Sequence, residues 1–569
     1  MSDEARRDGM PNRVVMLGPA GGGAEIARRA KVAVEREWDS WVRQALALNP
    51  EAQGGPGTPA TPGFPVIQWV CVPALPGGYL AQWARVRDLL DARRRVRDFS
   101  DVSRWERRTL CSLSPRWPAE DSPDGLKEYE KDTLSAVNWV KRRWRRIQNQ
   151  DGFASTSSIA SAGYRRDVAD RLGDPEVAAA VSELMGAARQ VRDERETPVP
   201  GLPDLRADPG RWLVRSAGPW IYEDRWQAES LARETKKELD ALRPAVVRGA
   251  AAARHLAKIM EGHGVAPPAS YLAVMVQDLD GMGMFLSGAR TNAAGVQLDV
   301  GPAAHVAISA ALRRLAAAHR RKLASPDLLG VPVYAGGDDL LAFVPAASAL
   351  AAAQACHDLI PPDLPTASTA VLFFHYHAGL QAAMSRAREM LDQAKAAVPG
   401  KHALAVGYMR RSGASEFSIQ PWAVPAIPGA PGGPAASSTA GLLGLFAVDR
   451  AHPLSPRLVT DLERDAGELS RLSVREDIYR AELARLVGRH IRKAGGSTED
   501  GTRPAAAQAP SGIQAATRQD VAAQAAGEAA DALWRLGQQE YTPRDAATPD
   551  GPRPARAARI GVFLRQEAR

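Results

Sequence analysis

Tyr271-Leu-Ala-Val-Met-Val-Gln-Asp-Leu-Asp-Gly-Met-Gly283 is the stretch of this 569-residue chain that most directly predicts its fold. Its first seven residues are mostly apolar and have the length of a buried strand, and two acids, Asp278 and Asp280, follow at the tip. Side chains two residues apart on an extended chain point the same way, and the glycines that follow let the backbone turn sharply. The stretch therefore predicts a strand that presents two carboxylates at one end.

A second pair of acids stands in a predicted hairpin. The segment 331–335 has the composition of a short strand, and the segment 340–344 predicts a strand that runs back beside it. Between them lies Gly336-Gly337-Asp338-Asp339, a tight turn that displays its two acids.

Predicted helices and strands alternate around these two acidic tips. Helices are expected at 303–324, 346–359 and 379–397, and a further strand at 370–374. The resulting β-α-β-β-α-β order, with acids at the first strand tip and in the hairpin turn, predicts a ferredoxin-like palm. The expected fold class is α+β, with several domains in a chain of this length.

The four aspartates Asp278, Asp280, Asp338 and Asp339 form a candidate donor set for divalent cations. Phosphoryl transfer between nucleotides needs Mg²⁺ or Mn²⁺, which hard oxygen ligands hold. Glycines before Asp338 leave room for a triphosphate against the turn. One such motif alone is often just an acidic turn, but two in order, each at the end of an apolar strand, favour a metal-nucleotide site.

These motifs resemble a known family. Asp278-Leu-Asp-Gly-Met-Gly283 with Tyr334-Ala-Gly-Gly-Asp-Asp-Leu-Leu-Ala342 is similar to the second palm domain of the large subunit of type III-B CRISPR complexes, the Cmr type. Four further segments are similar to its pattern around the first palm and the middle helical domain: Phe153-Ala-Ser-Thr-Ser-Ser-Ile-Ala160, Leu134-Ser-Ala-Val-Asn-Trp-Val-Lys-Arg142, Met10-Pro-Asn-Arg13 and the stretch Leu90 to Phe99. The resemblance extends over most of the chain up to about residue 413.

The resemblance implies an activity and assigns roles to the site residues. In that family the palm joins ATP molecules into cyclic oligoadenylate when target RNA is bound. Asp338 and Asp339 would be catalytic, and two metal ions would be held by the ligands Asp278, Leu279 (through its carbonyl), Asp280, Asp338 and Asp339.

Three further residues would contact the nucleotide. Gly336 and Gly337 would admit the triphosphate, and Lys395 resembles the lysine that palm-type cyclases place on phosphates. A solvated lysine at the end of a helix is an equally good interpretation of Lys395.

The resemblance also implies partners and a domain order. Guide RNA, target RNA and other Cmr-type subunits are the expected partners, and the net charge of +8 is compatible with polyanions. The expected domains are a partial first palm at 1–110, a mostly helical middle domain at 111–265, the palm with the acidic site at 266–415, a linker at 416–440, and a helical domain at 441–569 with a low-complexity insert at about 495–527. No membrane span or signal peptide is predicted, so a cytoplasmic location is expected.

The chain departs from the family in two places. It begins near the Met10-Pro-Asn-Arg13 segment, so neither the HD nuclease domain nor the opening of the first palm is expected in it. Cys111-Ser-Leu-Ser114 stands where the family has half of a zinc site, and the serine makes zinc binding doubtful.

Other motifs are given little weight. Gly18-Pro-Ala-Gly-Gly-Gly23 lacks the Lys and Ser/Thr of a phosphate loop. His357-Asp358 lacks the further ligands of an HD site, and the pair His375 and His377 lacks a third metal ligand. On the basic and aromatic segment 139–146, a solvated face and a contact with RNA or a subunit are equal alternatives.

Three functional hypotheses remain open. The first is an RNA-activated cyclic oligoadenylate synthase, and the second is a catalytically silent subunit that holds RNA and partner proteins. The third is a diguanylate-cyclase-like enzyme, which is disfavoured because Leu340 follows Asp339 where those enzymes commonly have an acid.

Overall fold

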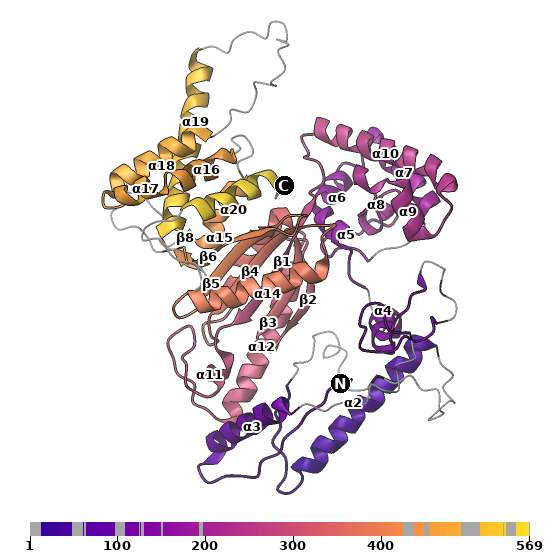
Figure 1. The fold of residues 1–569 in the computed structure, drawn as a ribbon, viewed down its shortest axis with the longest axis vertical. Helices are drawn as coiled ribbons and strands as arrows, with labels where there is room; N and C mark the ends of the chain where they lie inside the picture. The colour runs from indigo at the N-terminus through magenta and orange to yellow at the C-terminus, as the bar shows by residue number, and fades with distance from the viewer. Residues whose placement is uncertain are drawn as a thin grey trace.

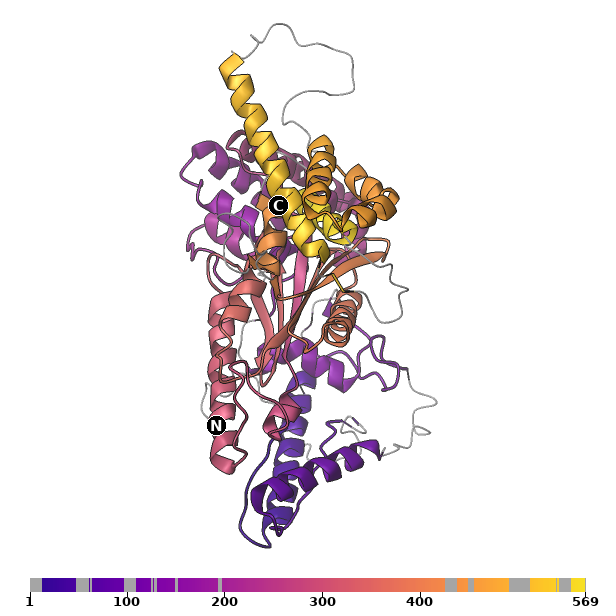
Figure 2. The same ribbon diagram turned by 90° about the vertical axis from the view of Figure 1, so that its left-hand side faces the viewer.

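The computed structural model places a six-stranded sheet between groups of helices (Figure 1). It describes residues 13–47, 61, 64–96, 109–123, 126, 130–148, 152–192, 197–424, 437–448, 455–490, 512–538, 540–541 and 554–567. Figure 2 shows the N-terminal helices (indigo) below the sheet and the C-terminal helices (yellow) above it.

The predicted palm is confirmed. Its elements are β1 (Tyr271–Leu279), α12 (Pro302–Leu323), β2 (Val331–Gly336), β3 (Asp339–Pro345), α13 (Ala349–Asp358) and β4 (Ala367–His375), with the short α11 (Met282–Leu286) after β1. The sheet order β2-β3-β1-β4, with β1 antiparallel to both neighbours, is that of a ferredoxin-like fold.

Strand β1 is buried on both faces because helices cover the sheet from both sides. Leu272, Val274 and Val276 pack in the core that contains α14 (Leu380–Ala397), whereas Ala273 and Met275 pack in the core on the other face. By the same alternation, Asp278 lies on the face covered by α14.

Two strands extend the palm beyond its predicted elements. After α14, β5 (Ala403–Met409) pairs parallel to β4, and β6 (Ser415–Pro421) pairs antiparallel to β5. The prediction of a linker from residue 416 is therefore wrong for residues 416–421. The polar start of β6 concealed it, because an edge strand buries only part of its length. Residues 425–436 lie outside the described part of the chain.

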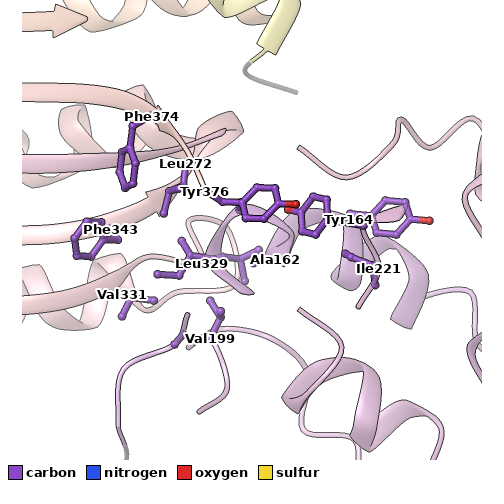
Figure 3. Packing of buried hydrophobic residues seen from close by; sticks show 14 of the residues in the cluster. Ala162, Tyr164, Val199, Ile221, Leu272, Leu329, Val331, Phe343, Phe374 and Tyr376 are labelled. Carbon is purple, nitrogen blue, oxygen red and sulfur yellow. The ribbon is translucent and has the colours of Figure 1, made fainter. Parts of the chain in front are cut away.

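The middle helices pack directly on the palm. They are α5 (Thr156–Ala160), α6 (Ala162–Ala169), α7 (Pro175–Val191), α8 (Gly210–Arg215), the short η3 (Glu223–Arg225), α9 (Ala228–Thr235) and α10 (Leu239–Gly262). Their apolar side chains form one cluster with those of the sheet, and Figure 3 shows Tyr376 between Phe374 at the strands and Tyr164 of the middle helices. The hydroxyl of Thr156 donates to the carbonyl of Tyr376 just beyond β4, at 2.9 Å.

The described N-terminal part consists of helices and extended segments. Helix α2 (Gly23–Leu46) packs on α4 (Ala136–Gln148), with the rings of Trp41 and Trp144 4.7 Å apart. Helix α3 (Gly78–Arg95) contacts the palm, where the side chain of Arg87 donates to the carbonyl of Gly283 at 3.1 Å. No strand of the sheet comes from the described part of residues 1–110, so the partial first palm stays a prediction.

A hydrogen-bond bridge stands at the degenerate zinc motif. The side-chain amide of Asn138 donates to the thiol of Cys111 and to the hydroxyl of Ser114, each at 3.1 Å. Hydrogen bonds from the Ser135 backbone and from Asn138 lower the pKa of the Cys111 thiol to about 7 against the opposing effect of burial. Asn138 therefore joins the two residues that zinc joins in the family pattern.

The C-terminal helices cover the other face of the sheet. They are α15 (Thr439–Val448), α16 (Arg457–Arg464), α17 (Ala466–Leu472), α18 (Glu476–His490), α19 (Gly512–Gln538) and α20 (Pro554–Glu567), and a two-residue pair, β7 (Ala423–Val424) with β8 (Ser437–Ser438), precedes them. Phe563 of α20 stacks on Tyr408 of β5 at 4.5 Å. Residues 512–527 of the expected low-complexity insert are helical, while 495–511 lie outside the described residues. None of the helices in the described ranges is long and apolar enough to cross a bilayer.

Gly218 tests the packing within the middle helices, between the segment after α8 and α5. A Cβ atom there would lie 1.9 Å from the hydroxyl of Ser158, whereas one at Gly163 in α6 would meet nothing within 4 Å. We expect Gly218→Ala to lower the free energy of unfolding by about 2 kcal/mol through overpacking. Gly163→Ala, the control, should keep or raise it by up to about 1 kcal/mol. Urea titration followed by circular dichroism measures both, and equal stabilities of the two variants would contradict the packing.

Candidate active site

Two of the predicted site residues face each other across neighbouring strands. Asp278 at the end of β1 is directly opposite Asp339 at the start of β3, and their carboxyl groups share a hydrogen bond. The amide of Leu279 donates to the carbonyl of Asp338 at 3.1 Å and so continues the pairing to the turn. Because directly opposite side chains lie close in an antiparallel pair, the register itself forces the two acids together.

The crowding of acids changes how they hold protons. Burial, the hydrogen bond with Asp278 and the charge of Asp338 together raise the pKa of Asp339 to about 7. Burial also raises the pKa of Asp338, and the charge of Asp278 adds to this, while Lys395 and Arg13 oppose it. Near neutral pH Asp339 therefore retains part of its proton, which a bound cation would displace.

Lys395 is not a solvated lysine in this structure. It lies in the last turn of α14, and its ammonium group forms an ion pair and a hydrogen bond with the carboxylate of Asp278. Only 17% of the lysine side chain and 26% of the aspartate side chain are exposed. The predicted contact of Lys395 with phosphates stays a prediction, and the partner of its ammonium group in this structure is Asp278.

Asp280 has surroundings of its own. It is fully buried, and its carboxylate accepts hydrogen bonds from the hydroxyls of Thr366 and Ser368, at 3.1 and 2.8 Å, and from the amide of His402 at 2.9 Å. Burial raises the pKa of Asp280 while these donors oppose the shift. Both of its oxygens thus tie the end of β1 to the starts of β4 and β5, and its predicted role as a metal ligand stays a prediction.

The glycines of the turn serve backbone shape and access. Gly337 has φ +63°, a conformation that favours glycine, and the space where a Cβ would stand is open. Gly336 pairs with Asp339 as the last residue of β2.

The four acids do not form a closed metal cage. In the described ranges no three His, Cys, Asp or Glu side chains are grouped so that they could hold a metal ion. The charge of Asp278 helps to raise the pKa values of Asp338 and Asp339, whereas Asp280 faces its own donors. A cation here would need further oxygen ligands, which the phosphates of a nucleotide can supply.

Two features of the site escaped the sequence analysis. Arg13, the last residue of a motif that was quoted only for its resemblance, lowers the pKa of Asp338 by its charge. The donors to Asp280 include Thr366 and Ser368, and the signal that could have found them is the polar alternation at the start of the otherwise apolar β4. The contribution of His402 is a backbone amide, which no side-chain pattern reveals.

Comparison with known proteins identifies the domain that carries this site. Residues 271–405 match the family model described as Cas10/Cmr2, second palm domain. The chain carries a Cas10/Cmr2 palm domain. All the predicted site residues, from Asp278 to Lys395, lie within this Cas10/Cmr2 segment.

A curated relative agrees with the Cas10/Cmr2 assignment. The CRISPR system Cmr subunit Cmr2 of Pyrococcus furiosus is 30% identical over 178 residues, which cover 27% of this chain and 20% of the relative. The recognised resemblance to a Cmr2/Cas10-type large subunit is confirmed. The chain thus matches about a fifth of the length of that relative.

Two solved structures are also similar. The type III-B Cmr-beta complex bound to cognate target RNA contains a chain with 13% identity and a TM-score of 0.47, and the match covers 74% of this chain and 58% of that one. In the apo state of Cmr-beta the identity is 13% and the TM-score 0.41, with coverage of 77% and 49%.

The raised pKa of Asp339 predicts a pH-dependent stability of the metal-free protein. The pKa is about 7 in the fold against an ordinary value of 3.8, so the stabilising effect of its proton is complete below about pH 4 and is lost as the pH rises through 7. We expect Asp339→Asn to be more stable than wild type by about 1 kcal/mol at pH 8, a reduced value because water reaches Asp339. Near pH 4 the difference should vanish.

Urea titrations in EDTA at pH 4, 6 and 8 measure this effect. The exposed acid Asp363 of the same domain provides the control, and Asp363→Asn should have the same free energy of unfolding as wild type at each pH. If Asp339→Asn also has the same free energy of unfolding as wild type at each pH, the raised pKa of Asp339 is contradicted.

Proposed function

We propose that this chain is the large subunit of a type III-B RNA-guided effector complex, and that its palm joins ATP into cyclic oligoadenylate when the complex binds target RNA. The observation that carries the proposal is the crowded pair Asp278 and Asp339 at the tip of a Cas10/Cmr2 palm domain. Guide RNA, target RNA and other Cmr-type subunits are the proposed partners.

The residues present fit a divalent cation. Asp278, Asp338 and Asp339, with the carbonyl of Leu279, would hold Mg²⁺ or Mn²⁺, because hard oxygen donors suit these ions and the acids repel one another without a cation. Such ions neutralise a triphosphate and lower the pKa of an attacking hydroxyl. In this proposal Asp280 holds the end of β1 in place through its hydrogen bonds with Ser368 and His402.

The protein groups have separate tasks in the proposed reaction. The 3'-hydroxyl of one ATP attacks the α-phosphorus of another, a phosphodiester bond forms, and pyrophosphate leaves. Asp339 releases its proton as the substrate complex forms. Lys395, freed from Asp278, turns its ammonium group to the phosphates, and the open side of Gly337 gives the triphosphate access to the turn.

The diguanylate-cyclase alternative receives no support from the residue after the acidic pair. Leu340 is 2% exposed and packs in the core on the face of the sheet opposite Asp339. Leu340 therefore stabilises the core of the sheet and presents no carboxylate to a nucleotide.

The activity test uses the reconstituted complex with partner subunits, guide RNA and complementary target RNA. We expect labelled ATP to yield cyclic oligoadenylate, and the double variant Asp338→Ala with Asp339→Ala to lose the activity by several orders of magnitude, because the cations lose their hairpin ligands. The matched control removes two exposed palm acids, Asp358→Ala with Asp363→Ala, and should remain active.

RNA binding is measured in the same preparations. A wild-type complex that binds target RNA but makes no oligoadenylate would contradict the proposed activity and favour the silent-subunit hypothesis.

A further inference from the structure

A polar cavity of about 290 Å³ lies between the middle helices and the palm. The hydroxyl residues Ser155, Thr156 and Ser157 line one part of it, and Arg225 and Trp220 line another. The first three belong to the motif Phe153–Ala160, to which the proposed function assigns no task. The cavity therefore brings a motif of the middle helices to the edge of the palm.

The cavity is separate from the carboxylate site. It is lined by Tyr376 and His377, immediately after β4, and the end of β4 pairs with the start of β1 through His375 and Tyr271. The acidic tip is at the other end of the same two strands, where Asp278 pairs with Ser368. Seven residues of strand at about 3.4 Å each separate the two ends by about 24 Å.

The charges in the cavity wall favour an anion. Glu234 forms ion pairs with both Arg192 and Arg225, at 2.9 and 2.5 Å, so two guanidinium groups share one carboxylate. Asp224 lies beside the cavity, where it accepts from the hydroxyl of Tyr376 at 2.8 Å. The Nε–H of Arg225 is buried and has no hydrogen-bond partner among the residues that the structure describes, so a bound anion could accept from it.

The neutral groups of the wall suit a phosphate with a ring attached. The hydroxyls of Ser155 and Ser157 lie 3.1 Å apart and can donate to one oxyanion. The guanidinium of Arg225 lies over Trp220, 5.5 Å from the ring centre, and the ring of His377 lies 4.2 Å from that of Tyr376. Flat rings beside such donors are the means by which proteins hold a base next to its phosphate.

We propose that this cavity binds a phosphate-bearing small molecule of the mononucleotide class. The phosphate accepts from Arg225 and from the serine hydroxyls, and the base lies against the rings at the cavity wall. The site is independent of the proposed synthesis of oligoadenylate, because it uses none of the palm carboxylates and no cation.

Equilibrium dialysis of labelled AMP against the full chain in excess EDTA tests the proposal. EDTA removes the cations that the palm site requires, so the remaining binding reports the cavity. We expect one AMP per chain, competition by inorganic phosphate, and much weaker competition by adenosine, which lacks the phosphate. If inorganic phosphate binds as tightly as AMP, free phosphate is the ligand of the same donors.

Variants locate the binding. We expect Arg225→Gln to weaken the binding of AMP by about tenfold or more, since the exchange removes a charged donor. Arg233→Gln, an exchange on α9 outside the cavity lining, should leave the affinity unchanged. His377→Ala keeps both ion pairs of Glu234, and it should weaken the binding of AMP but not the binding of inorganic phosphate. This variant provides a second test if Arg225→Gln fails to fold.

Two results would overturn the proposal. One is the absence of both AMP and phosphate binding in EDTA. The other is binding that survives in the cavity variants but is lost in Asp278→Asn with Asp339→Asn. Neither result bears on oligoadenylate synthesis, which is measured separately in the assembled complex.

Discussion

The repulsion between two carboxylates that the sheet holds face to face is the constraint on which the site depends. The antiparallel register of β1 and β3 sets Asp278 opposite Asp339, and the same register buries Val276 and Leu341. A slip of one residue would turn every apolar side chain of β1 to the wrong face, so the core fixes the register firmly. The free energy of the core thus holds together two acids that carry like charges, and repel each other, once Asp339 loses its proton.

Asp278 and Asp280 at the end of β1 and Asp339 at the start of β3 have different roles because their surroundings differ. Asp280 accepts three hydrogen bonds in the interior and joins the strand ends, whereas Asp278 meets another acid and an ammonium group. Asp339 keeps its proton to about pH 7 because it lies beside Asp278 and Asp338. Lys395 supplies a positive charge beside Asp278. In the proposed function, a cation would take the places of this ammonium group and of the proton on Asp339.

The palm could be predicted from the sequence because each of its signals is local. An apolar run that ends in acids and a Gly-Gly turn between two short strands are written in consecutive residues, and both were found at 271–283 and 331–344. What the sequence could not show depends on distant segments. The burial of Asp280 depends on a loop near residue 366 and on the backbone amide of His402, and the approach of Arg13 to Asp338 depends on how the N-terminal segment folds back.

The most direct test of the acid pair as a cation site is the binding of Mn²⁺ to the purified chain, measured from the loss of the free-ion signal in electron paramagnetic resonance. The account predicts that Asp278→Asn with Asp339→Asn weakens Mn²⁺ binding by at least about tenfold, since two charged ligands are lost. It predicts that Asp280→Asn, whose site faces its own protein donors, retains the wild-type affinity. Wild-type affinity in the double variant, or loss of binding in Asp280→Asn alone, would contradict it.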